Sequence, residues 1–478
     1  MPFPQHKTKI VGTLGPASDS QAMIERLLRA GLSIVRLNFS HGDFSRHAEA
    51  IARVRAAERA TGRRVAILAD LPGPKMRLGK IEPEPIHLQA GDRFTLTTEE
   101  VVGSAQRVSM SFERLPAVVK PGDRLFLNDG LVQLTVDQVS ATDVLCTVAV
   151  GGELRTRKGL NLPGIELGIG AFTPHDRACL EFAIRHGVDA VSQSFVESAA
   201  DIVAVREAAR ALGGNPFLVA KIERAGAVAR IDEILAVTDG IMIARGDLGV
   251  EVPIEEIAIL QKHLIAKANR AGKPVITATQ MLESMVNSRL PTRAEATDVA
   301  NAILDGTDAV MLSAESAVGQ FPEESVAMLA RIAARTESVR PRPVSVDRGA
   351  TTKSAGTPVL AECVASVVEY AISAVPCSAV AVPTRTGTTA RMISRFKPAP
   401  WIVAFGPDRG ISQGLVFSYG VHPVEVTEDP DDWSSFARRW LREAGVKGER
   451  AVLVAGPSLR HPGANHRLEI MALGEGRE

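Results

Sequence analysis

Short apolar runs alternate along this chain with segments whose apolar residues have helical spacing. Helical spacing is clear in Gln21–Ala30, Phe44–Arg59 and Ile257–Ala271. Near-continuous apolar runs are typical of parallel strands that helices cover on both faces. The expected strands are Ile10–Leu14, Ser33–Leu37, Val65–Asp70, Asp189–Phe195, Phe217–Ile222, Gly240–Ala244, Pro274–Ala278 and Ala309–Leu312. About eight βα units predict an α/β protein whose strands close into a (β/α)8 TIM barrel.

The pattern changes between Pro72 and Gly170, where period-two alternation replaces the helical spacing. Leu125–Val136 contains the dipeptide Asp129-Gly130 between two alternating runs, which predicts a β-hairpin. We therefore expect a β-rich, β-barrel-like domain at 72–170, inserted into a barrel made of 1–71 and 171–340. An insertion after the third strand lies at the face where such barrels carry active sites, so we interpret it as a lid.

A third unit follows the Pro-rich segment Arg340–Val344. A helix is expected at Val359–Ala374, starting after Pro358. Strands are expected at Ala379–Val382, Ile402–Phe405, Val421–Val426 and Ala451–Val454. This alternation predicts a smaller open α/β domain at 350–478.

Composition narrows the class of protein. The 478 residues carry 55 basic and 55 acidic side chains, and this zero net charge argues against a nucleic-acid or acidic-membrane binder. No apolar run resembles a signal peptide or a membrane span. The four cysteines, Cys146, Cys179, Cys363 and Cys377, have no metal-finger spacing, so we expect reduced packing residues in a cytoplasmic protein.

Polar side chains follow six of the expected barrel strands. Because parallel strands end at one mouth of a barrel, these residues should form a common site, although helix caps use some of the same residue types. The residues are Arg36, Asn38, Ser40, His41, Asp70, Lys221, Glu223, Arg245, Asp247, Thr279, Gln280, Ser313 and Glu315.

The residue types indicate a reaction class. Glu223 and Asp247 offer hard oxygen ligands for Mg²⁺ or Mn²⁺, while Arg36 and Lys221 offer positive charge. A metal and cations without an activated nucleophile favour phosphoryl transfer. The segment 244–249 could form a helical turn whose N–H groups bind a carboxylate, or a plain turn.

Several motifs resemble those of pyruvate kinases, in order along essentially the whole chain. They are Lys9–Ser18, Arg36–Gly42, Lys221–Arg224, Ala244–Gly249, Ala278–Met285, Pro291–Glu295 and Asp298–Ala302. The resemblance implies Mg²⁺-dependent transfer of the phosphoryl group of phosphoenolpyruvate to ADP, giving pyruvate and ATP at the end of glycolysis.

By this resemblance, Glu223 and Asp247 would hold the divalent ion, and Lys221, Thr279 and Arg36 would be catalytic. Substrate would contact the catalytic three and the segment Ala244, Arg245, Gly246 and Asp247. The nucleotide would lie near Asn38, His41, Arg77 and Lys158, with Ser313 and Glu315 supporting the site from behind. Thr279 either donates the proton to enolpyruvate or orders a water molecule, and the residues leave both possibilities open.

One departure from the family pattern concerns K⁺. Many members have a threonine and a glutamate at the lid hinge, where this chain has Leu71 and Lys75. The Lys75 ammonium could replace a bound K⁺ beside Asn38, Ser40 and Asp70, which predicts activity without K⁺. The alternative is an exposed hinge lysine with K⁺ still bound.

A loop of the C-terminal unit, 383–389, places hydroxyls and a glycine before a helix. In the resembling family the equivalent loop binds a phosphorylated allosteric effector, whereas a well-capped helix would explain the same residues. The candidate effector residues are Thr384, Thr386, Gly387, Thr388 and Thr389. The loop 456–466 could contribute.

Other readings stay open from the residues alone. A metal-dependent pyruvate aldolase shares the barrel, the acid pair and the arginine, and a catalytically silent, effector-binding relative shares the fold. An enzyme that works in the opposite direction on pyruvate is a third alternative. The resemblance implies a homotetramer, but the effector, the preferred nucleotide and the physiological metal do not follow from the sequence.

Overall fold

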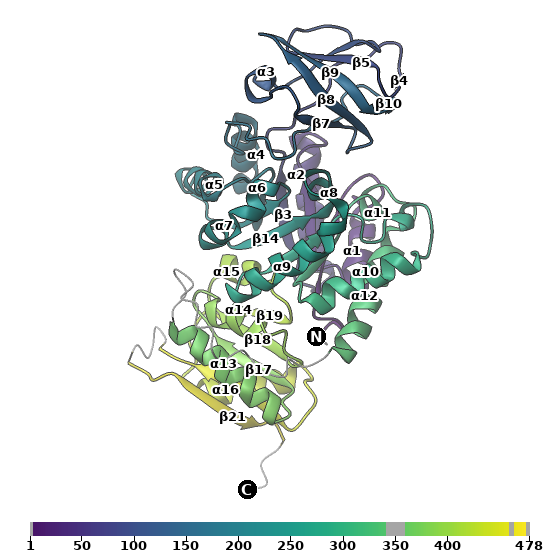
Figure 1. Cartoon of the computed structure of the whole chain (residues 1–478). Coiled ribbons are helices and arrows are strands. Elements are labelled where there is room, and N and C mark those ends of the chain that lie inside the picture. Colours follow the sequence, from purple (N-terminus) through teal and green to yellow (C-terminus); the bar gives the residue numbers. More distant parts are fainter. Residues whose placement is uncertain (1–2, 341–358, 458–462, 475–478) are drawn as a thin grey trace.

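The computed structural model describes residues 3–340, 359–457 and 463–474. Its centre is a closed barrel of eight parallel strands in the order β1-β16-β15-β14-β13-β12-β3-β2 (Figure 1). The strands are β1 (Lys9–Thr13), β2 (Ile34–Asn38), β3 (Ala66–Leu71), β12 (Ala190–Gln193), β13 (Phe217–Ile222), β14 (Gly240–Ala244), β15 (Val275–Ala278) and β16 (Ala309–Leu312). The predicted barrel is therefore confirmed, and its strands are buried as their apolar runs predict.

Helices surround the barrel, and polar residues fix where several of them begin. Thr173 with Asp176, and Thr292 with Glu295, form reciprocal capping boxes at the starts of two helices. The helices are α1 (Gln21–Ala30), α2 (Phe44–Thr61), α4 (Pro174–Arg185), α5 (Ala199–Ala211), α6 (Ala225–Ala229), α7 (Ile231–Val237), α8 (Arg245–Glu251), α9 (Ile257–Arg270), α10 (Arg293–Asp305), α11 (Ala314–Ala317) and α12 (Pro322–Val339), with short 3-10 turns η1 (Ile254–Glu256) and η2 (Glu283–Val286).

The segment between β3 and α4 forms a separate β-rich lobe with its own apolar core. It holds a six-stranded sheet in the order β11-β7-β8-β9-β5-β6 and a two-stranded sheet of β10 and β4. The elements are β4 (Ile86–Leu88), β5 (Arg93–Thr97), β6 (Arg107–Ser109), α3 (Leu115–Val118), β7 (Arg124–Leu127), β8 (Val132–Val139), β9 (Asp143–Val150), β10 (Gly152–Leu154) and β11 (Leu160–Asn161). The predicted hairpin is present, because β7 pairs antiparallel with β8 across Asp129 and Gly130.

The C-terminal unit is an open five-stranded sheet in the order β19-β18-β17-β20-β21 with helices on it. Its elements are α13 (Val359–Ala374), β17 (Ala379–Pro383), α14 (Thr388–Ser394), β18 (Trp401–Gly406), α15 (Arg409–Leu415), β19 (Val421–Glu425), α16 (Trp433–Glu443), β20 (Arg450–Ala455) and β21 (Arg467–Ala472). The four predicted strands are present. Strand β21 was not predicted, because it is an antiparallel edge strand whose largely exposed residues give little apolar signal.

Two expectations fall partly outside the described residues: the Pro-rich linker after Arg340 with Pro358, and the middle of the loop 456–466. The four cysteines are all within the described part, and each is a free thiol. Cys146 and Cys179 are buried as predicted, but Cys363 is exposed and is not a packing residue. No helix in the described ranges is long and apolar enough to cross a membrane.

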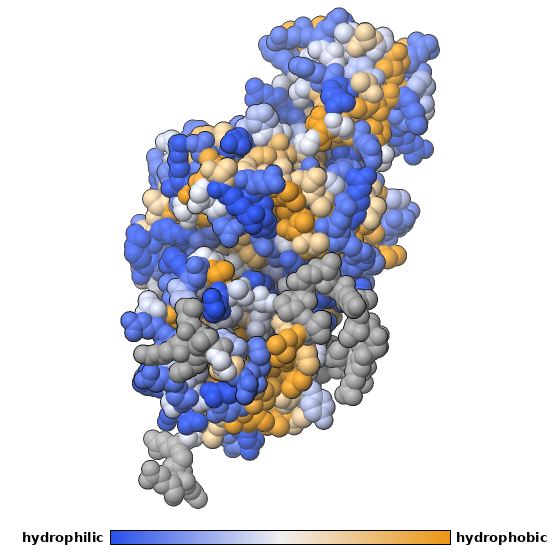
Figure 2. Space-filling view, turned by 90° about the vertical axis from the view of Figure 1, so that its left-hand side faces the viewer, coloured by the Kyte–Doolittle hydropathy of each residue, from blue (hydrophilic) through white to orange (hydrophobic). Residues whose placement is uncertain are grey.

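The lid and the C-terminal domain lie at opposite ends of the barrel (Figure 1). The lid projects from the barrel as a lobe of its own, and hydrophilic residues cover much of the visible barrel surface (Figure 2). At the other end, Val416 and Phe417 of the C-terminal domain join the apolar cluster that fills the barrel interior. The Phe417 ring stacks on Phe217 with 4.9 Å between centroids, so the C-terminal domain closes the bottom of the barrel.

Candidate active site

The carboxyl ends of the barrel strands bring the predicted charged residues together. Arg36 on β2 donates from Nη2 to Oδ2 of Asp70 on β3 at 2.5 Å, and from Nε to the same oxygen at 3.0 Å. The Lys221 ammonium, at the end of β13, lies 3.4 Å from that oxygen. Both cations are therefore anchored on one buried carboxylate.

Lys221 is held on three sides. Its Nζ lies 2.7 Å from Oε1 of Glu223 and donates to Oγ of Ser194 at 2.7 Å. Burial acts to lower the pKa of Lys221, but the charges of Asp70 and Glu223 outweigh it and hold the pKa above its ordinary value. Lys221 is thus a fixed cation at the barrel mouth.

Asp70 remains ionised in spite of its burial. Burial alone would raise the pKa of its carboxyl group, but Lys221, Arg36 and a hydrogen bond from Ser192 lower it to about 2. The Ser192 hydroxyl donates to Oδ1 of Asp70 at 2.7 Å. The negative charge of Asp70 therefore fixes the guanidinium and the ammonium without consuming all of their donors.

Two further carboxylates lie near Lys221. Glu223 directly follows β13 and accepts a hydrogen bond from the Phe195 N–H at 2.7 Å. Asp247 lies in the first turn of α8, and burial followed by the charge of Glu223 raises its pKa to about 6. The buried carboxylate of Glu223 and the half-buried one of Asp247 repel each other, and such a pair fits a site for a hard divalent cation. In the described ranges, no group of three or more His, Cys, Asp or Glu side chains is placed to hold a metal ion. Substrate and water would therefore have to supply the remaining ligands.

Thr279 joins the end of β15 to the start of α8. Its Oγ1 accepts a hydrogen bond from the Gly246 N–H at 2.7 Å. The residue has a φ of 69°, a conformation that costs a β-branched residue energy and that surrounding contacts must hold. Arg245 provides such a contact, donating to the Thr279 carbonyl oxygen at 2.9 Å and to Asp298 at 2.7 Å.

The buried carboxylate of Glu315 supports the segment after Thr279. Its Oε1 accepts from the Leu282 N–H at 3.1 Å, and its Oε2 accepts from the Ser313 N–H at 2.8 Å. The Glu315 carboxylate therefore links the segment after β15 to the end of β16.

Lys75 lies on the lid connector with its charge directed at the same mouth. Burial and the charges of Lys221 and Arg77 lower the pKa of Lys75, whereas Asp70 and Glu223 raise it. Asn38 uses its Oδ1 to accept the Ser40 N–H at 3.1 Å. Among the described residues, Lys75 Nζ makes no direct hydrogen bond to Asn38, Ser40 or Asp70. The structure thus places the charge of Lys75 within electrostatic reach of Asp70, without a hydrogen bond to it.

The residues expected near a nucleotide lie at the rim and on the two lid connectors. Arg77 donates from Nη1 to the Arg157 carbonyl oxygen at 2.9 Å, and Leu78 N–H donates to the Lys158 carbonyl oxygen at 2.9 Å. The His41 side chain is largely exposed at the rim. The pKa of its imidazole is lowered mainly by the part of the ring that is buried, and further by the charges of Lys75, Arg77 and Arg36. The Lys158 side chain makes no hydrogen bond or ion pair to mouth residues in the described part of the chain.

The candidate effector loop lies in the C-terminal domain, between β17 and α14. Thr384 Oγ1 accepts from the Gly387 N–H at 2.9 Å, and the hydroxyls of Thr386 and Thr388 are 2.9 Å apart. Gly387 has a φ of 78° and precedes α14, so it meets a conformational requirement of this turn. These contacts within the loop also fit a capped helix.

Three hydroxyl residues of the site escaped the sequence analysis. They are Ser192 and Ser194, and also Thr13, whose Oγ1 accepts from Arg36 Nη1 at 3.0 Å. Ser192 and Ser194 could have been predicted from the polar tripeptide Ser192-Gln193-Ser194 at the end of β12. A threonine in a strand carries no comparable signal, because strands favour threonine generally.

Fold and site together define a (β/α)8 barrel protein with a β-rich lid and a mouth of two fixed cations and three carboxylates. A family model described as pyruvate kinase, barrel domain, matches residues 5–326, and one described as pyruvate kinase, alpha/beta domain, matches residues 362–471. The chain therefore belongs to the pyruvate kinase family.

Individual relatives agree with this assignment. The chain is 48% identical over 430 residues to a pyruvate kinase of Thermococcus litoralis, covering 90% of each chain. It is 40% identical over 481 residues to a pyruvate kinase of Geobacillus stearothermophilus, covering 98% of this chain and 81% of the relative. A crystal structure of a pyruvate kinase from Cryptosporidium parvum matches with a TM-score of 0.88 and 33% identity, covering 98% of this chain and 97% of the other. Membership implies a divalent metal cofactor, with phosphoenolpyruvate and ADP as substrates.

Proposed function

We propose that this chain transfers the phosphoryl group of phosphoenolpyruvate to ADP, giving pyruvate and ATP in the last step of glycolysis. The observation that carries the proposal is the fixed group of Arg36, Asp70, Lys221 and Glu223 at the barrel mouth. Phosphoryl transfer depends on positioning and on electrostatic stabilisation, and this group supplies both.

Glu223 and Asp247 would hold Mg²⁺ or Mn²⁺, with substrate and water completing its coordination. The bound ion would draw negative charge from the phosphoryl and enolate oxygens of the substrate. The raised pKa of Asp247 supports this assignment, because burial and the Glu223 charge are the conditions that a bound cation relieves. Chelation of divalent ions should abolish activity, and readdition should restore it.

The cations have separate tasks. Arg36 would contact the phosphoryl oxygens with the guanidinium donors that Asp70 and Thr13 leave free. Lys221 would stabilise the bridging oxygen as the bond to phosphorus breaks, since Ser194 and Glu223 hold its ammonium in place. No proton needs to leave Lys221, because its raised pKa keeps it charged throughout.

The start of α8 would bind the substrate carboxylate through the segment Ala244, Arg245, Gly246 and Asp247. Thr279 would complete this contact and lie beside the carbon that gains a proton when enolpyruvate becomes pyruvate. Its hydroxyl accepts the Gly246 N–H and lies 2.6 Å from the Ala278 carbonyl oxygen. That arrangement supports a hydroxyl of fixed orientation, suited either to donate a proton or to order a water molecule.

Asn38, His41, Arg77 and Lys158 would face the nucleotide. Arg77 and Lys158 lie on the two connectors of the lid, so a movement of the lid would carry both toward the phosphates. Closure would also exclude water, which competes with ADP for the phosphoryl group.

Activity would not require K⁺, because Lys75 provides the monovalent charge. The charges of Asp70 and Glu223 act to raise the pKa of Lys75, and the charge of Lys75 acts to lower the pKa of Asp247, which supports this proposal. The variant Lys75→Glu should become strongly dependent on K⁺, whereas Lys80→Glu, at an exposed lysine of the same connector, should not. Strong K⁺ activation of the unaltered protein would contradict the proposal.

The chain would act as a cytoplasmic homotetramer. Each subunit would have three domains: the barrel, the lid at 72–170 and the C-terminal domain at 350–478.

The loop with Thr384, Thr386, Gly387, Thr388 and Thr389 would bind a phosphorylated effector. Thr388→Glu should abolish activation by such an effector, and unchanged activation would contradict this assignment.

The direct test of the reaction is pyruvate formation from phosphoenolpyruvate with Mg²⁺, with and without ADP. We expect pyruvate only with ADP, together with equal amounts of ATP. Pyruvate released from a hydroxy-keto acid without nucleotide would instead identify a pyruvate aldolase. Absence of both reactions in folded protein would identify a silent relative.

A further inference from the structure

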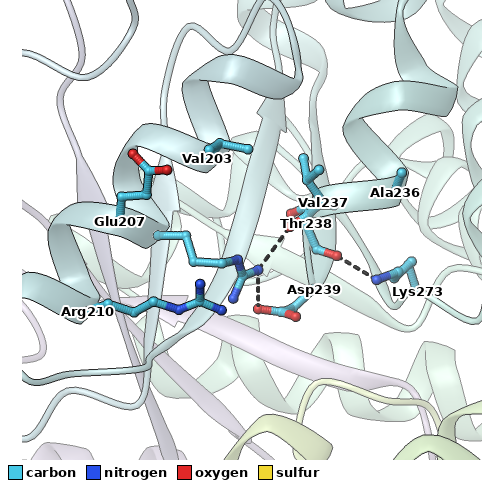
Figure 3. Close-up of a pocket in the computed structure, with 9 residues that line it drawn as sticks. Val203, Glu207, Arg210, Ala236, Val237, Thr238, Asp239 and Lys273 are labelled. Atoms are coloured by element: carbon cyan, nitrogen blue, oxygen red, sulfur yellow. Dashed lines mark hydrogen bonds and ion pairs between the residues drawn. The ribbon is translucent and has the colours of Figure 1, made fainter. Parts of the chain in front are cut away.

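A cavity of about 420 Å³ opens on the outside of the barrel, at the end opposite the active site. It lies between residues 203–210 of α5, the end of α7 and the loop before β15 (Figure 3). Lys273 lines this cavity and also contributes to a smaller one shared with Arg391 and Ser394 of α14. The cavity therefore lies beside the junction of the barrel with the C-terminal domain.

Three cationic side chains line the cavity. Arg206 and Arg210 belong to α5. Figure 3 shows Lys273 reaching in from the side opposite Arg210. Two carboxylates also line it, but Asp239 is committed to Arg206 at 3.0 Å and to the Leu218 N–H at 2.9 Å. The other, Glu207, points away from the Arg210 guanidinium (Figure 3). The inward-facing side chains thus carry an excess of positive charge.

The cations retain free hydrogen-bond donors. Arg206 uses Nη2 for Asp239 and for the Val237 carbonyl oxygen at 2.9 Å, which leaves its other nitrogens available. Lys273 spends one donor on the Thr238 carbonyl oxygen at 2.6 Å. Within the described part of the chain, the Arg210 side chain has neither an ion pair nor a hydrogen bond.

A fourth cationic side chain, Arg391, lies next to the cavity, in the smaller one that shares Lys273. Arg391 lies close enough for its charge to lower the pKa of Lys273, together with burial, which is the larger cause, and Arg206. Burial also lowers the pKa of Arg391 itself. Arg391 donates to the Thr386 carbonyl oxygen at 2.8 Å, so it connects this junction with the loop 384–389.

We propose that this cavity is a second anion site, which binds the phosphoryl group of a small phosphorylated metabolite through Arg206, Arg210 and Lys273. Guanidinium groups recognise phosphate oxygens through paired donors, and the cavity has the size of small-molecule sites. Binding here does not depend on the barrel-mouth reaction. A bound anion would lie beside Arg391 and would therefore change the electrostatics at the junction of the barrel with the C-terminal domain.

Calorimetric titration of the full chain with glycerol 3-phosphate, inorganic phosphate and glycerol tests the proposal. We expect the two phosphates to bind and glycerol not to bind, and Arg210→Glu to weaken binding at least tenfold. Arg59→Glu is the matched control, since Arg59 is likewise an exposed arginine in the last turn of a barrel helix. It should bind as the unaltered protein does, and the KM for phosphoenolpyruvate should be unchanged in both variants.

Three results would overturn the proposal: no binding of either phosphate, equal losses in Arg210→Glu and Arg59→Glu, or a loss confined to Thr388→Glu. The last would assign phosphate binding to the loop 384–389. Equal affinities for the two phosphates would support recognition of the phosphoryl group itself. Tighter binding of glycerol 3-phosphate would support an organic phosphate as occupant.

Discussion

At the residue scale, the position of the Lys221 ammonium depends on a hydroxyl that touches no substrate in our proposal. Ser194 accepts from Lys221 Nζ at 2.7 Å, while Glu223 attracts the same ammonium from the other side. Without Ser194 the ammonium would move toward Glu223 and away from the bridging oxygen. Ser194 is thus a positioning residue for Lys221.

We predict that Ser194→Ala lowers kcat by about ten- to a hundredfold and leaves KM for phosphoenolpyruvate within about twofold, since a hydrogen bond to a charged group contributes ~1.5–3 kcal/mol. Steady-state kinetics measure the change, with Ser338→Ala on the exposed end of α12 as the control. A variant with unaltered kcat would show that Asp70 and Glu223 position Lys221 without the serine.

The sequence could predict the charged residues of the site but not their hydroxyl partners. Lys221 and Glu223 stand out because they end a buried apolar strand, and Arg36 does so for the same reason. Ser194 and Thr13 do not stand out, because hydroxyl residues are common in strands and loops whether or not they bind a cation. Whether Lys75 forms a hydrogen bond to Asn38 depends on the path of the lid connector, which no local pattern determines.

At the element scale, β19 places a histidine in an apolar environment. Burial, followed by the charges of Lys9 and Arg64, lowers the pKa of His422 from 6.5 to about 4. Its ring packs against Phe3 and Trp440, with centroids 5.1 and 5.9 Å away. The native state therefore contains neutral His422, and acid must charge this half-buried ring.

We predict that acid destabilises the protein partly through His422. Because the folded pKa lies below the unfolded value, the contribution is complete above pH 6.5 and is lost as the pH falls toward 4, by ~3 kcal/mol. The variant His422→Phe keeps an aromatic ring and cannot titrate, so its Tm should fall less over this range. Parallel Tm profiles of the two proteins would contradict the assignment.

The elements themselves followed from the sequence more completely than the site did. All eight barrel strands could be predicted because each is buried on both faces and reads as one apolar run. Strand β21 could not, since Arg467–Ala472 is an edge strand with Arg467, Ile470 and Ala472 exposed. Its pairing with β20 is a tertiary contact that local periodicity does not encode.

At the scale of the whole molecule, the C-terminal domain contributes to the interior of the barrel. Phe417 is fully buried among barrel residues and stacks on Phe217. Two polar contacts accompany it: Lys397 lies 2.6 Å from Asp308, and Lys9 donates to the Val421 carbonyl oxygen at 2.8 Å. The two domains should therefore unfold together.

We predict that Phe417→Ala destabilises this joint unit by ~3–5 kcal/mol, the usual loss for a buried phenylalanine. Calorimetry should show a lower Tm and the separation of one transition into two. The control Phe436→Ala removes a half-buried ring within the C-terminal domain, so it should lower the Tm less and leave one transition. A single transition at the original Tm in Phe417→Ala would contradict the coupling.

The measurement that tests the central claim most directly is the joint formation of ATP and pyruvate from phosphoenolpyruvate and ADP. It should be run with Mg²⁺ in K⁺ buffer and in tetramethylammonium buffer, for the unaltered protein and for Lys221→Met. We predict equal amounts of both products at similar rates in the two buffers, and a rate at least a thousandfold lower in Lys221→Met. Pyruvate without ATP, or full activity in Lys221→Met, would contradict phosphoryl transfer at this site.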